Sequence, residues 1–378
     1  MAGAQDVGGS AGLRVGFFSD AVPERNGVGT YYRDLSDHLQ DRVEGCQMFC
    51  PEPDASRWEE PIRLPLPGDS TQSVIVPNPR KLSRRFEELA PHAVVLATPG
   101  PYGLLGLRLA RKHQARIVVG FHTHFERLTD LYWKRSLGLG KVFRYYLESC
   151  NRLLFRHASI VLANSGEMVE LARRIGAPSA ELMGTTIPRP FIDTPVSPLR
   201  DELAVVTFAG RLAAEKNLQA IVAAAEQLPG VDFRIAGDGP ERNIIVDAAA
   251  RLANLDYLGW TPREKMLEVI DATDMLILPS HVESFGTIAL EAMTRNRTVL
   301  VSASCGITQW PDLSPGLFRI GDGETAADAI ARVASLDPAV RRQKAHLGRE
   351  AAVALNEWTL QHWIDVLTRQ MSPHAAHA

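Results

Sequence analysis

Short apolar runs alternate with segments of helical periodicity along most of this chain. In the first half, apolar runs bounded by turn residues lie at residues 13–20, 46–50, 62–66, 92–97, 116–121 and 159–165. Helix-like segments follow several of them, at residues 30–39, 104–113, 137–157 and 167–175. Continuous apolar strands that alternate with helices are typical of a parallel sheet covered by helices on both faces. The first half therefore predicts a doubly wound α/β domain of the Rossmann-like kind.

The second half repeats the alternation and predicts a second domain of the same class. Strands are expected at residues 204–209, 233–236, 257–259, 275–278 and 298–302, and helices at residues 218–228, 242–252, 263–271 and 287–293. A proline-rich stretch separates the halves, and Trp358 and Trp363 at helical spacing indicate a terminal helix. We expect a disordered tail at 1–12, a first domain at 13–185, a linker at 186–203, a second domain at 204–355, and a final helix and tail at 356–378.

Composition narrows the class of protein. A chain of 378 residues exceeds what one core usually holds, and 45% hydrophobic with 22% charged residues is typical of a globular protein. The net charge of −3 gives no general attraction to nucleic acid. We find no apolar run of membrane-spanning length and no signal peptide at 1–12. The four cysteines form no CxxC pair, so we expect reduced thiols and a cytoplasmic location.

One candidate site lies where the apolar run at 275–280 meets a predicted helix. The connecting residues are Glu283-Ser284-Phe285-Gly286-Thr287, and Glu291 follows one helical turn later. A strand, a turn and a helix start form an anion site, because free backbone N–H groups and the helix dipole face the ligand. The two glutamates would accept hydrogen bonds from sugar hydroxyls. The stretch is thus typical of a nucleotide-sugar pocket, although an ordinary strand-turn-helix with two surface glutamates has the same pattern.

A second motif, Gly210-Arg211-Leu212 to Glu215-Lys216-Asn217, has the same context of strand before and helix after. Arg211 and Lys216 can both reach a diphosphate at the ends of parallel strands. Together the two motifs resemble the donor site of retaining GT-B glycosyltransferases of family 4, also called glycosyl transferases group 1. That family includes mannosyl-, glucosyl- and sulfoquinovosyl-transferases.

The resemblance implies a fold and a set of roles. The fold would be GT-B, with two Rossmann-like domains that face each other across a cleft and a C-terminal helix that crosses back to the first. The nucleotide sugar would bind mainly to the second domain, with its ribose on Glu291 and its sugar hydroxyls on Glu283. The implied catalytic residues are His122, Arg211, Lys216 and Glu283, and the implied donor-binding residues are Gly27, Gly210, Trp260, Ser284, Phe285, Gly286, Thr287 and Glu291.

Three of these assignments have competing interpretations. His122 and His124 follow a strand, and a histidine pair there is also compatible with a metal site, but only Glu126 nearby would support zinc. The resemblance gives His122 a contact to the transferred sugar, and His124 is read as a packed or acceptor-side histidine. Gly27 is favoured over Gly29 for close approach to the donor. Trp260 either stacks on the base or is an ordinary tryptophan at a strand end.

Residues 137–157 mix large apolar side chains with basic ones. Lys141, Arg144, Arg152 and Arg156 lie inside this segment, and Lys134 and Arg135 precede it. A basic amphipathic helix can lie on an anionic membrane, but it can equally have one face in the core and one in solvent. Lipid-modifying family members carry a surface of this kind. Contact with the inner face of the plasma membrane therefore stays open.

The resemblance implies retaining transfer of a hexose from a UDP-glucose-type donor or GDP-mannose to a hydroxyl of a lipid or lipid-linked acceptor. No cofactor or divalent metal is expected, because two cationic side chains and helix amides would neutralise the phosphates. The alternatives are a soluble sugar or polyol acceptor and a non-catalytic nucleotide-sugar-binding protein. Departures from the family pattern at 295–298 and at Ser304-Cys305-Gly306 leave the sugar unassigned.

Overall fold

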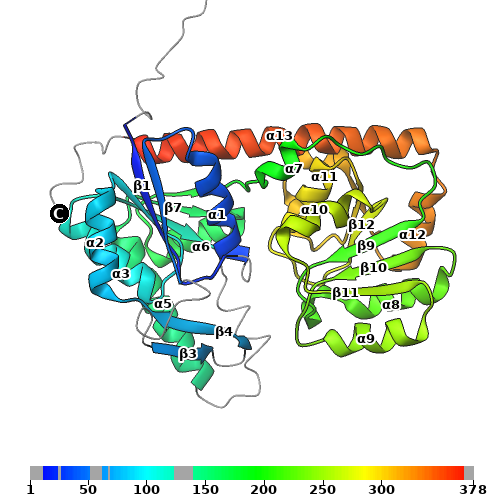
Figure 1. Ribbon diagram of the computed structural model, residues 1–378, viewed down its shortest axis with the longest axis horizontal. Coiled ribbons are helices and arrows are strands. Elements are labelled where there is room, and N and C mark those ends of the chain that lie inside the picture. The colour runs from blue at the N-terminus through cyan, green and yellow to red at the C-terminus, as the bar shows by residue number, and fades with distance from the viewer. Residues whose placement is uncertain (1–11, 24–26, 52–61, 67–68, 123–138, 370–378) are drawn as a thin grey trace, which may run out of the picture. The chain divides into compact units, whose positions relative to one another are not determined.

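A computed structural model describes residues 12–23, 27–51, 62–66, 69–122 and 139–369. The chain forms two compact units, Met1–Thr186 with Trp358–Ala378, and Ile187–Glu357 (Figure 1). The long terminal helix α13 (Pro338–Thr368) begins in unit 2 and ends in unit 1. Both units are built on a six-stranded parallel sheet, so the predicted fold class is confirmed.

The sheet of unit 1 has the strand order β2-β1-β5-β6-β7-β8, and all its neighbours pair in parallel. The strands are β1 (Arg14–Phe18), β2 (Gly45–Phe49), β5 (Ala93–Leu96), β6 (Arg116–Phe121), β7 (Ile160–Ala163) and β8 (Ala180–Leu182). The helices that accompany them are α1 (Gly27–Leu39), α2 (Pro79–Leu89), α3 (Pro101–Lys112), α5 (Leu139–His157) and α6 (Gly166–Ile175).

Alternate residues of each strand in unit 1 enter different hydrophobic clusters. In β5, Val94 and Leu96 join side chains of α2, α3, α5 and α6, whereas Ala93 and Val95 join side chains of α1 and α13. Successive side chains of a strand point to opposite faces, so this sheet is buried on both sides. This burial is the reason that the strands read as continuous apolar runs in the sequence.

Two strands of unit 1 were not predicted. Residues 62–66 form the expected strand, β3 (Ile62–Leu66), but it pairs antiparallel with β4 (Asp69–Val76) in a separate hairpin. At the edge of the main sheet, β8 has three residues, Ala-Glu-Leu. Neither segment gave a periodic signal, because β4 begins with five polar or acidic residues and β8 is too short to show alternation.

The end of α13 is part of the core of unit 1. Trp363 is fully buried and its Nε1 donates a hydrogen bond to the Tyr31 hydroxyl over 2.8 Å. That hydroxyl donates in turn to the Gly184 carbonyl over 3.1 Å. A Cβ on Gly184 would lie 1.8 Å from Oγ1 of Thr359, so the helix approaches this backbone too closely for any other residue. The terminal helix is therefore a structural part of the first sheet's core, as the fold class predicted.

The sheet of unit 2 has the order β11-β10-β9-β12-β13-β14. Its strands are β9 (Val205–Ala209), β10 (Asp232–Ala236), β11 (Leu255–Gly259), β12 (Met275–Leu278), β13 (Thr298–Val301) and β14 (Leu317–Arg319). Its helices are α7 (Arg189–Asp193), α8 (Leu218–Gln227), α9 (Arg242–Arg251), α10 (Arg263–Asp271), α11 (Thr287–Thr294) and α12 (Ala326–Ala334), with short 3₁₀ turns η1 (Ala214–Lys216), η2 (Gly306–Gln309) and η3 (Pro311–Gly316).

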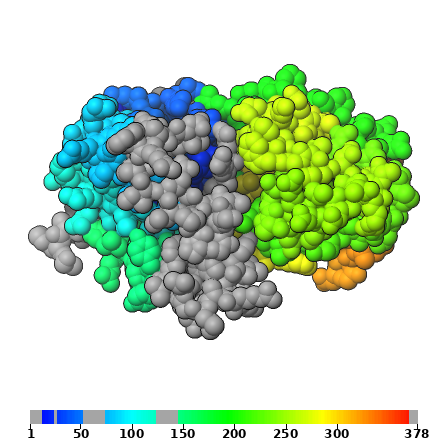
Figure 2. All heavy atoms as spheres, turned by 60° about the horizontal axis from the view of Figure 1, so that its bottom comes forward, coloured from blue at the N-terminus to red at the C-terminus, as the bar shows by residue number. Residues whose placement is uncertain are grey.

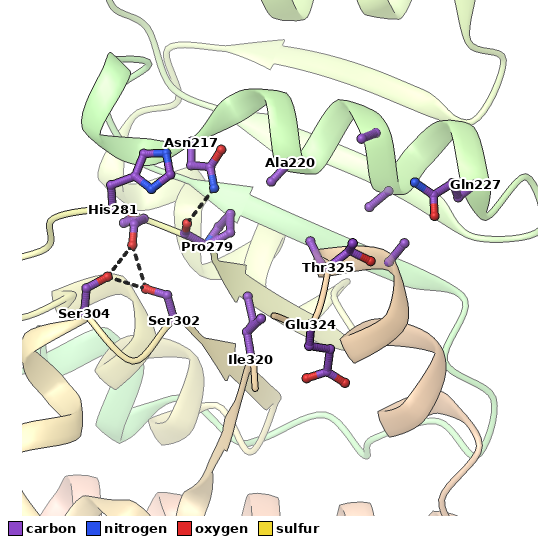
Figure 3. A pocket seen from close by; sticks show the side chains of 15 residues that line it. Asn217, Ala220, Gln227, Pro279, His281, Ser302, Ser304, Ile320, Glu324 and Thr325 are labelled. Atoms are coloured by element: carbon purple, nitrogen blue, oxygen red, sulfur yellow. Dashed lines mark hydrogen bonds between the residues drawn. The ribbon is translucent and has the colours of Figure 1, made fainter. Parts of the chain in front are cut away.

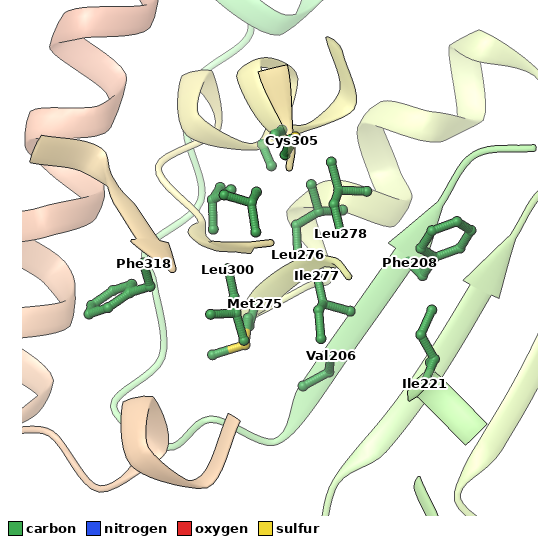
Figure 4. Close-up of a cluster of buried hydrophobic side chains, with 14 of the residues drawn as sticks. Val206, Phe208, Ile221, Met275, Leu276, Ile277, Leu278, Leu300, Cys305 and Phe318 are labelled. Carbon is green, nitrogen blue, oxygen red and sulfur yellow. The ribbon is translucent and has the colours of Figure 1, made fainter. Parts of the chain in front are cut away.

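The core of unit 2 is centred on the paired strands β9 and β12 (Figure 4). Val206, Met275 and Leu276 are fully buried, and Met275 lies opposite Val206 in the parallel register. The chain runs from β9 outward through β10 to β11, and then returns to the other side of β9 as β12. This reversal of strand order is a topological switch point, where open α/β sheets bind ligands at the carboxyl ends of their strands.

Residues 187–203 of the predicted linker 186–203 belong to unit 2, where a buried arginine holds their backbone. Phe191 of α7 enters the core, and the guanidinium of Arg295 donates to the carbonyl oxygens of Phe191, Thr194 and Pro195 over 2.7–3.1 Å. Arg295 also pairs with Asp271 at 2.8 Å. A buried cation requires such partners. This network occupies the position where the sequence departs from the usual turn of the family.

Candidate functional site

The loop that follows β9 is held against the neighbouring strand ends by backbone contacts. Gly210 has φ of +154°, and its N–H donates to the Ala236 carbonyl over 3.0 Å. Leu212 N–H donates to Asp238 over 3.0 Å. A Cβ on Gly237 would lie 1.8 Å from the Gly210 carbonyl oxygen, so the β10 loop needs glycine there. Arg211, half-buried, lies on this fixed loop at the carboxyl edge of the sheet.

The loops after β9 and β12 bind each other directly. The Glu215 carbonyl accepts hydrogen bonds from the N–H groups of His281 and Val282 over 2.8 and 3.3 Å. The Asn217 side chain donates to the Pro279 carbonyl over 3.2 Å. The two motifs that are far apart in the sequence therefore form one continuous structure at the switch point.

The two loops also share an ion pair. Lys216 Nζ lies 2.5 Å from Glu283 Oε2, and the two side chains are only 14% and 17% exposed. From the sequence, we expect Lys216 to bind the diphosphate of a ligand and Glu283 to bind the sugar of the same ligand. Nothing in the sequence indicates that the two side chains contact each other. In this structure each is the other's charge partner.

The turn before α11 is fixed by the loop after β13. Gly306 N–H donates to the Glu283 carbonyl over 2.9 Å, and Ile307 N–H donates to the Phe285 carbonyl over 2.8 Å. A Cβ on Gly306 would lie 1.9 Å from the Ser284 carbonyl oxygen. The Phe285 ring is buried and meets Trp310 edge-on at 6.0 Å between centroids. The backbone of this turn is thus held in one conformation while its outer side stays accessible.

The start of α11 has the features of an anion site. Its N-cap residue, Gly286, has φ of +92° and no side chain to cap the helix. The first N–H groups of a helix have no intrahelical acceptor, and the helix dipole adds partial positive charge there. Ser284 and Thr287 are exposed on either side of Gly286. The predicted residues of this turn therefore lie at one accessible helix end.

Glu291, inside α11, is paired with a residue that the sequence did not indicate. Arg263 Nη2, in the first turn of α10, donates to Glu291 Oε1 over 3.1 Å. Burial raises the pKa of the Glu291 carboxyl, and the charge of Arg263 opposes that rise. A single arginine forms no motif, so this position carried no signal by itself. In the part of the chain that the structure describes, Arg263 makes the one side-chain bond to this carboxylate.

Trp260 lies in the connection between β11 and α10, three residues before Arg263. Its side chain is 55% exposed. The preceding Gly259 has φ of +71°, and its carbonyl accepts a bond from the Gly237 N–H over 2.8 Å. The structure therefore places Trp260 at the same sheet edge as the β10 loop, with most of its ring in solvent.

A pocket of about 400 Å³ borders the two loops on the side of α8 and α12 (Figure 3). Asn217, Pro279 and His281 belong to its lining. On its floor, the Ser280 carbonyl accepts hydrogen bonds from the hydroxyls of Ser302 and Ser304, each over 2.7 Å. The side chains of Ser302 and Ser304 thus support the segment that leads from β12 to Glu283.

In unit 1, His122 follows β6 and lies among aromatic side chains. Its Nε2 is 2.9 Å from the Tyr32 hydroxyl, and its ring centroid lies 5.3 and 5.2 Å from those of Tyr31 and Tyr32. Burial lowers the pKa of His122 to about 3. The imidazole is therefore neutral at physiological pH and acts as a hydrogen-bonding group. His124 and Glu126 lie outside the described residues.

Gly27 and Gly29, both in the first turn of α1, differ in their steric needs. A Cβ on Gly29 would lie 2.8 Å from the carbonyl oxygens of both Ala21 and Val22, so this position requires glycine. Among the described residues, nothing lies within 4 Å of a Cβ on Gly27. The close backbone approach that glycine permits is thus made by Gly29, while Gly27 is exposed at the helix start.

The described part of α5 has one buried and one exposed side. Tyr145, Arg152, Leu153 and Arg156 are exposed, with Tyr145 at 71%, whereas Leu154 is fully buried. The blue-green spheres of this part of the chain lie at the lower edge of unit 1 in Figure 2. The side chains of Lys141 and Arg144, and residues Lys134 and Arg135, lie outside the described residues. No described helix combines the length and apolarity needed to cross a bilayer.

The sequence matches the family Glycosyltransferase Family 4 over residues 25–183 and the family Glycosyl transferases group 1 over residues 192–342. The chain therefore belongs to the glycosyltransferases of family 4, group 1, and the resemblance inferred from the two motifs is confirmed. Each match covers one of the two Rossmann-like halves.

Individual relatives agree with this membership. The chain is 30% identical to D-inositol 3-phosphate glycosyltransferase of Mycolicibacterium smegmatis over 187 residues, which are 46% of this chain and 42% of that relative's length. It is 23% identical to alpha-monoglucosyldiacylglycerol synthase of Acholeplasma laidlawii over 325 residues, which are 76% and 80% of the two chains. The structure of Anabaena HepE in complex with UDP-glucose has a TM-score of 0.61 at 15% identity, over 93% of this chain and 99% of that one, which shows a shared fold.

The environment of His122 generates a direct test. In a sample with labelled histidines, we expect the His122 ring signals to stay at the neutral position from pH 8 down to about 5, because burial disfavours the charged form. The His122→Gln variant assigns the signal. A titration midpoint near the ordinary value of 6.5 would contradict the buried, neutral imidazole.

Proposed function

We propose that this protein is a retaining glycosyltransferase that moves a hexose from a nucleotide sugar to an acceptor hydroxyl. The observation that carries the proposal is the junction of the two loops at the switch point of unit 2. That junction pairs Lys216 with Glu283 just before the start of α11, whose second turn carries Glu291, and Arg211 lies on the same loop as Lys216 after β9. A diphosphate needs the cations and amides, and a ribose and a hexose need the carboxylates.

The nucleotide sugar would lie along the carboxyl edge of this sheet. Its diphosphate binds Arg211, Lys216 and the N–H groups of Phe285, Gly286 and Thr287, with Gly210 and Ser284 beside it. Its ribose diol donates to Glu291, its base approaches Trp260, and its hexose hydroxyls donate to Glu283. His122 and Gly27 belong to unit 1, and their assignment to the sugar and the diphosphate rests on the family resemblance.

The proposed reaction breaks the bond between the anomeric carbon and the phosphate oxygen. The leaving nucleoside diphosphate takes the electron pair, the acceptor oxygen bonds to the same face of the anomeric carbon, and the acceptor proton passes to the leaving phosphate. Negative charge builds up on the leaving group, so cations placed beforehand lower the barrier. Arg211, Lys216 and the helix amides would supply that charge, and we expect no need for a divalent metal.

The donor class is supported by the solved neighbours. The Anabaena HepE structure contains UDP-glucose, so a UDP-hexose is the first donor to test. GDP-mannose is the second donor to test. The exposed Trp260 would stack on either uracil or guanine, and Glu291 would bind only the ribose, which both donors contain.

For the acceptor we favour a lipid or lipid-linked head group. The exposed side of α5 combines Tyr145 and Leu153 with Arg152 and Arg156, which suits an anionic membrane surface. The Acholeplasma relative is named for synthesis of a glucosyl diacylglycerol. A soluble sugar or polyol is the competing acceptor, and it follows if the α5 surface does not bind lipid.

Transfer itself is tested at the cations. With UDP-glucose or GDP-mannose and a lipid extract, the protein should release nucleoside diphosphate, and Arg211→Ala or Lys216→Ala should reduce turnover about 10²-fold, because each loses a cation that acts on the leaving group. Arg251→Ala, on the exposed side of α9, serves as the control. Near-normal turnover in both loop variants would place the diphosphate elsewhere.

The Arg263–Glu291 pair gives a pH-dependent expectation. A ribose contact is equal in ground and transition states, so Arg263→Met should raise the donor KM with little change in kcat. Loss of the cation raises the pKa of Glu291 further, and the carboxyl group can accept from both ribose hydroxyls with both oxygens only when it is ionised. The KM should therefore rise as pH falls, and in Arg263→Met this rise should begin at a higher pH. Lys265→Met removes an exposed charge from the same helix as control, and a pH profile identical to wild type would exclude the role.

Membrane binding by α5 is tested with liposomes. Each basic side chain near an anionic leaflet contributes roughly 1 kcal/mol, so reversing Arg152 and Arg156 to Glu should weaken co-sedimentation at least about tenfold. Binding of the wild type should also fade at high salt through screening. Reversing Arg108 and Arg111, exposed on α3, controls for net charge. If wild type does not sediment with anionic vesicles at low salt, the acceptor is soluble.

A further inference from the structure

The Lys216–Glu283 ion pair joins the two side chains that the proposed function assigns to the diphosphate and to the hexose. Lys216 Nζ and Glu283 Oε2 are 2.5 Å apart and both side chains are largely shielded from water. Removing one partner of a shielded pair leaves the other with an uncompensated charge, which costs more than the pair itself contributes. A diphosphate that draws Lys216 away therefore leaves a carboxylate without its cation and close to new negative charge.

We propose that this ion pair makes binding of the diphosphate conditional on the presence of the sugar. The inference rests on the proposed function. An intact nucleotide sugar gives Lys216 a phosphate and gives Glu283 the hydroxyls of the hexose, so both members of the pair regain partners. A spent nucleoside diphosphate gives Lys216 a partner and gives Glu283 none. After transfer the pair re-forms, which favours release of the product.

The surrounding structure prevents Glu283 from avoiding this cost by a movement of its backbone. Its carbonyl is bound by the Gly306 N–H, and Glu283 forms an isolated bridge with Cys305. Lys216 ends the η1 turn, whose Glu215 carbonyl is bound by the loop after β12. A change of partner by Lys216 or Glu283 therefore requires movement of the side chains only, because the backbone of both residues is fixed.

Cys305, a titratable residue that interacts with both members of the pair, offers no replacement for the cation. Burial raises the pKa of the Cys305 thiol to about 12, with the Glu283 charge as the next cause. The thiol is therefore neutral at physiological pH, and its Sγ donates to the Phe285 carbonyl at 3.4 Å. A thiol is neutral when protonated and negative when ionised, so Cys305 cannot compensate a carboxylate that has lost Lys216.

The test is Glu283→Gln, which keeps the size of the side chain and removes its charge. Calorimetry would measure the Kd of UDP and of UDP-glucose, and of the GDP and GDP-mannose pair, at low salt. We expect the variant to bind the nucleoside diphosphate at least about tenfold more tightly than wild type, because Lys216 is no longer held by a carboxylate. Its affinity for the intact donor should not rise, so the preference for donor over product should fall by a similar factor.

Two further variants separate the pair from general effects. Glu215→Gln removes the same charge one residue from Lys216 and should change UDP affinity by less than about threefold. In a Lys216→Met background, Glu283→Gln should no longer tighten UDP binding, because the ion pair between the two side chains is already absent. Circular dichroism and melting temperature verify that each variant is folded.

The outcomes are distinct. If wild type binds UDP but Glu283→Gln binds it no more tightly, or if Glu215→Gln tightens it equally, the conditional exchange is wrong while the proposed function stands. If wild type binds neither the nucleoside diphosphates nor the sugar nucleotides, the proposed function fails and the inference fails with it. Tighter UDP binding in Glu283→Gln alone supports the exchange.

Discussion

The parallel pairing of β9 with β12 determines the position of the candidate site in unit 2. Met275 is registered with Val206 and Leu276 with Thr207, so the carboxyl ends of the two strands leave the sheet side by side. All four side chains are buried, and the hydrophobic burial that stabilises the pair also fixes its register. Because β12 returns to the opposite side of β9 from β10, the helices that follow diverge and leave the strand ends open.

At the ends of these strands, backbone hydrogen bonds between loops fix the positions of the candidate site residues. The Glu215 carbonyl binds the loop after β12, and the loop after β13 binds the carbonyls of Glu283 and Phe285. Gly237 and Gly306 permit backbone approaches that a Cβ would block. The charged tips then hold one another in pairs, Lys216 with Glu283 and Arg263 with Glu291. The proposed exchange of partners would favour ligands that satisfy both members of a pair at once.

In unit 1, aromatic side chains pack against the predicted site residue His122. His122 lies among Tyr31 and Tyr32, and the hydroxyl of Tyr31 also binds the buried Trp363 of α13. The terminal helix therefore contributes directly to the aromatic cluster behind His122. A neutral imidazole in such a cluster forms hydrogen bonds and does not supply a charge.

The sequence by itself determined the features that follow from local pattern. The buried strands were readable because residues such as Val94 and Leu276 belong to runs that are apolar on both faces, and the two loop motifs were readable because each follows such a run and precedes a helix. The short strand β8 and the polar start of β4 lacked that pattern and were missed.

The tertiary structure decided which side chains meet. Nothing in the sequence pairs Lys216 with Glu283, Arg263 with Glu291, or Arg295 with the carbonyls of 191–195, because each of these contacts joins segments that only the packing of the sheet brings together. A steric requirement for glycine likewise falls on Gly29, since it arises from the carbonyls of Ala21 and Val22 across the loop. The hydrophobic periodicity of a segment shows which of its faces is buried. A contact between two charged side chains depends on the distance between their elements, and that distance is set only when the chain folds.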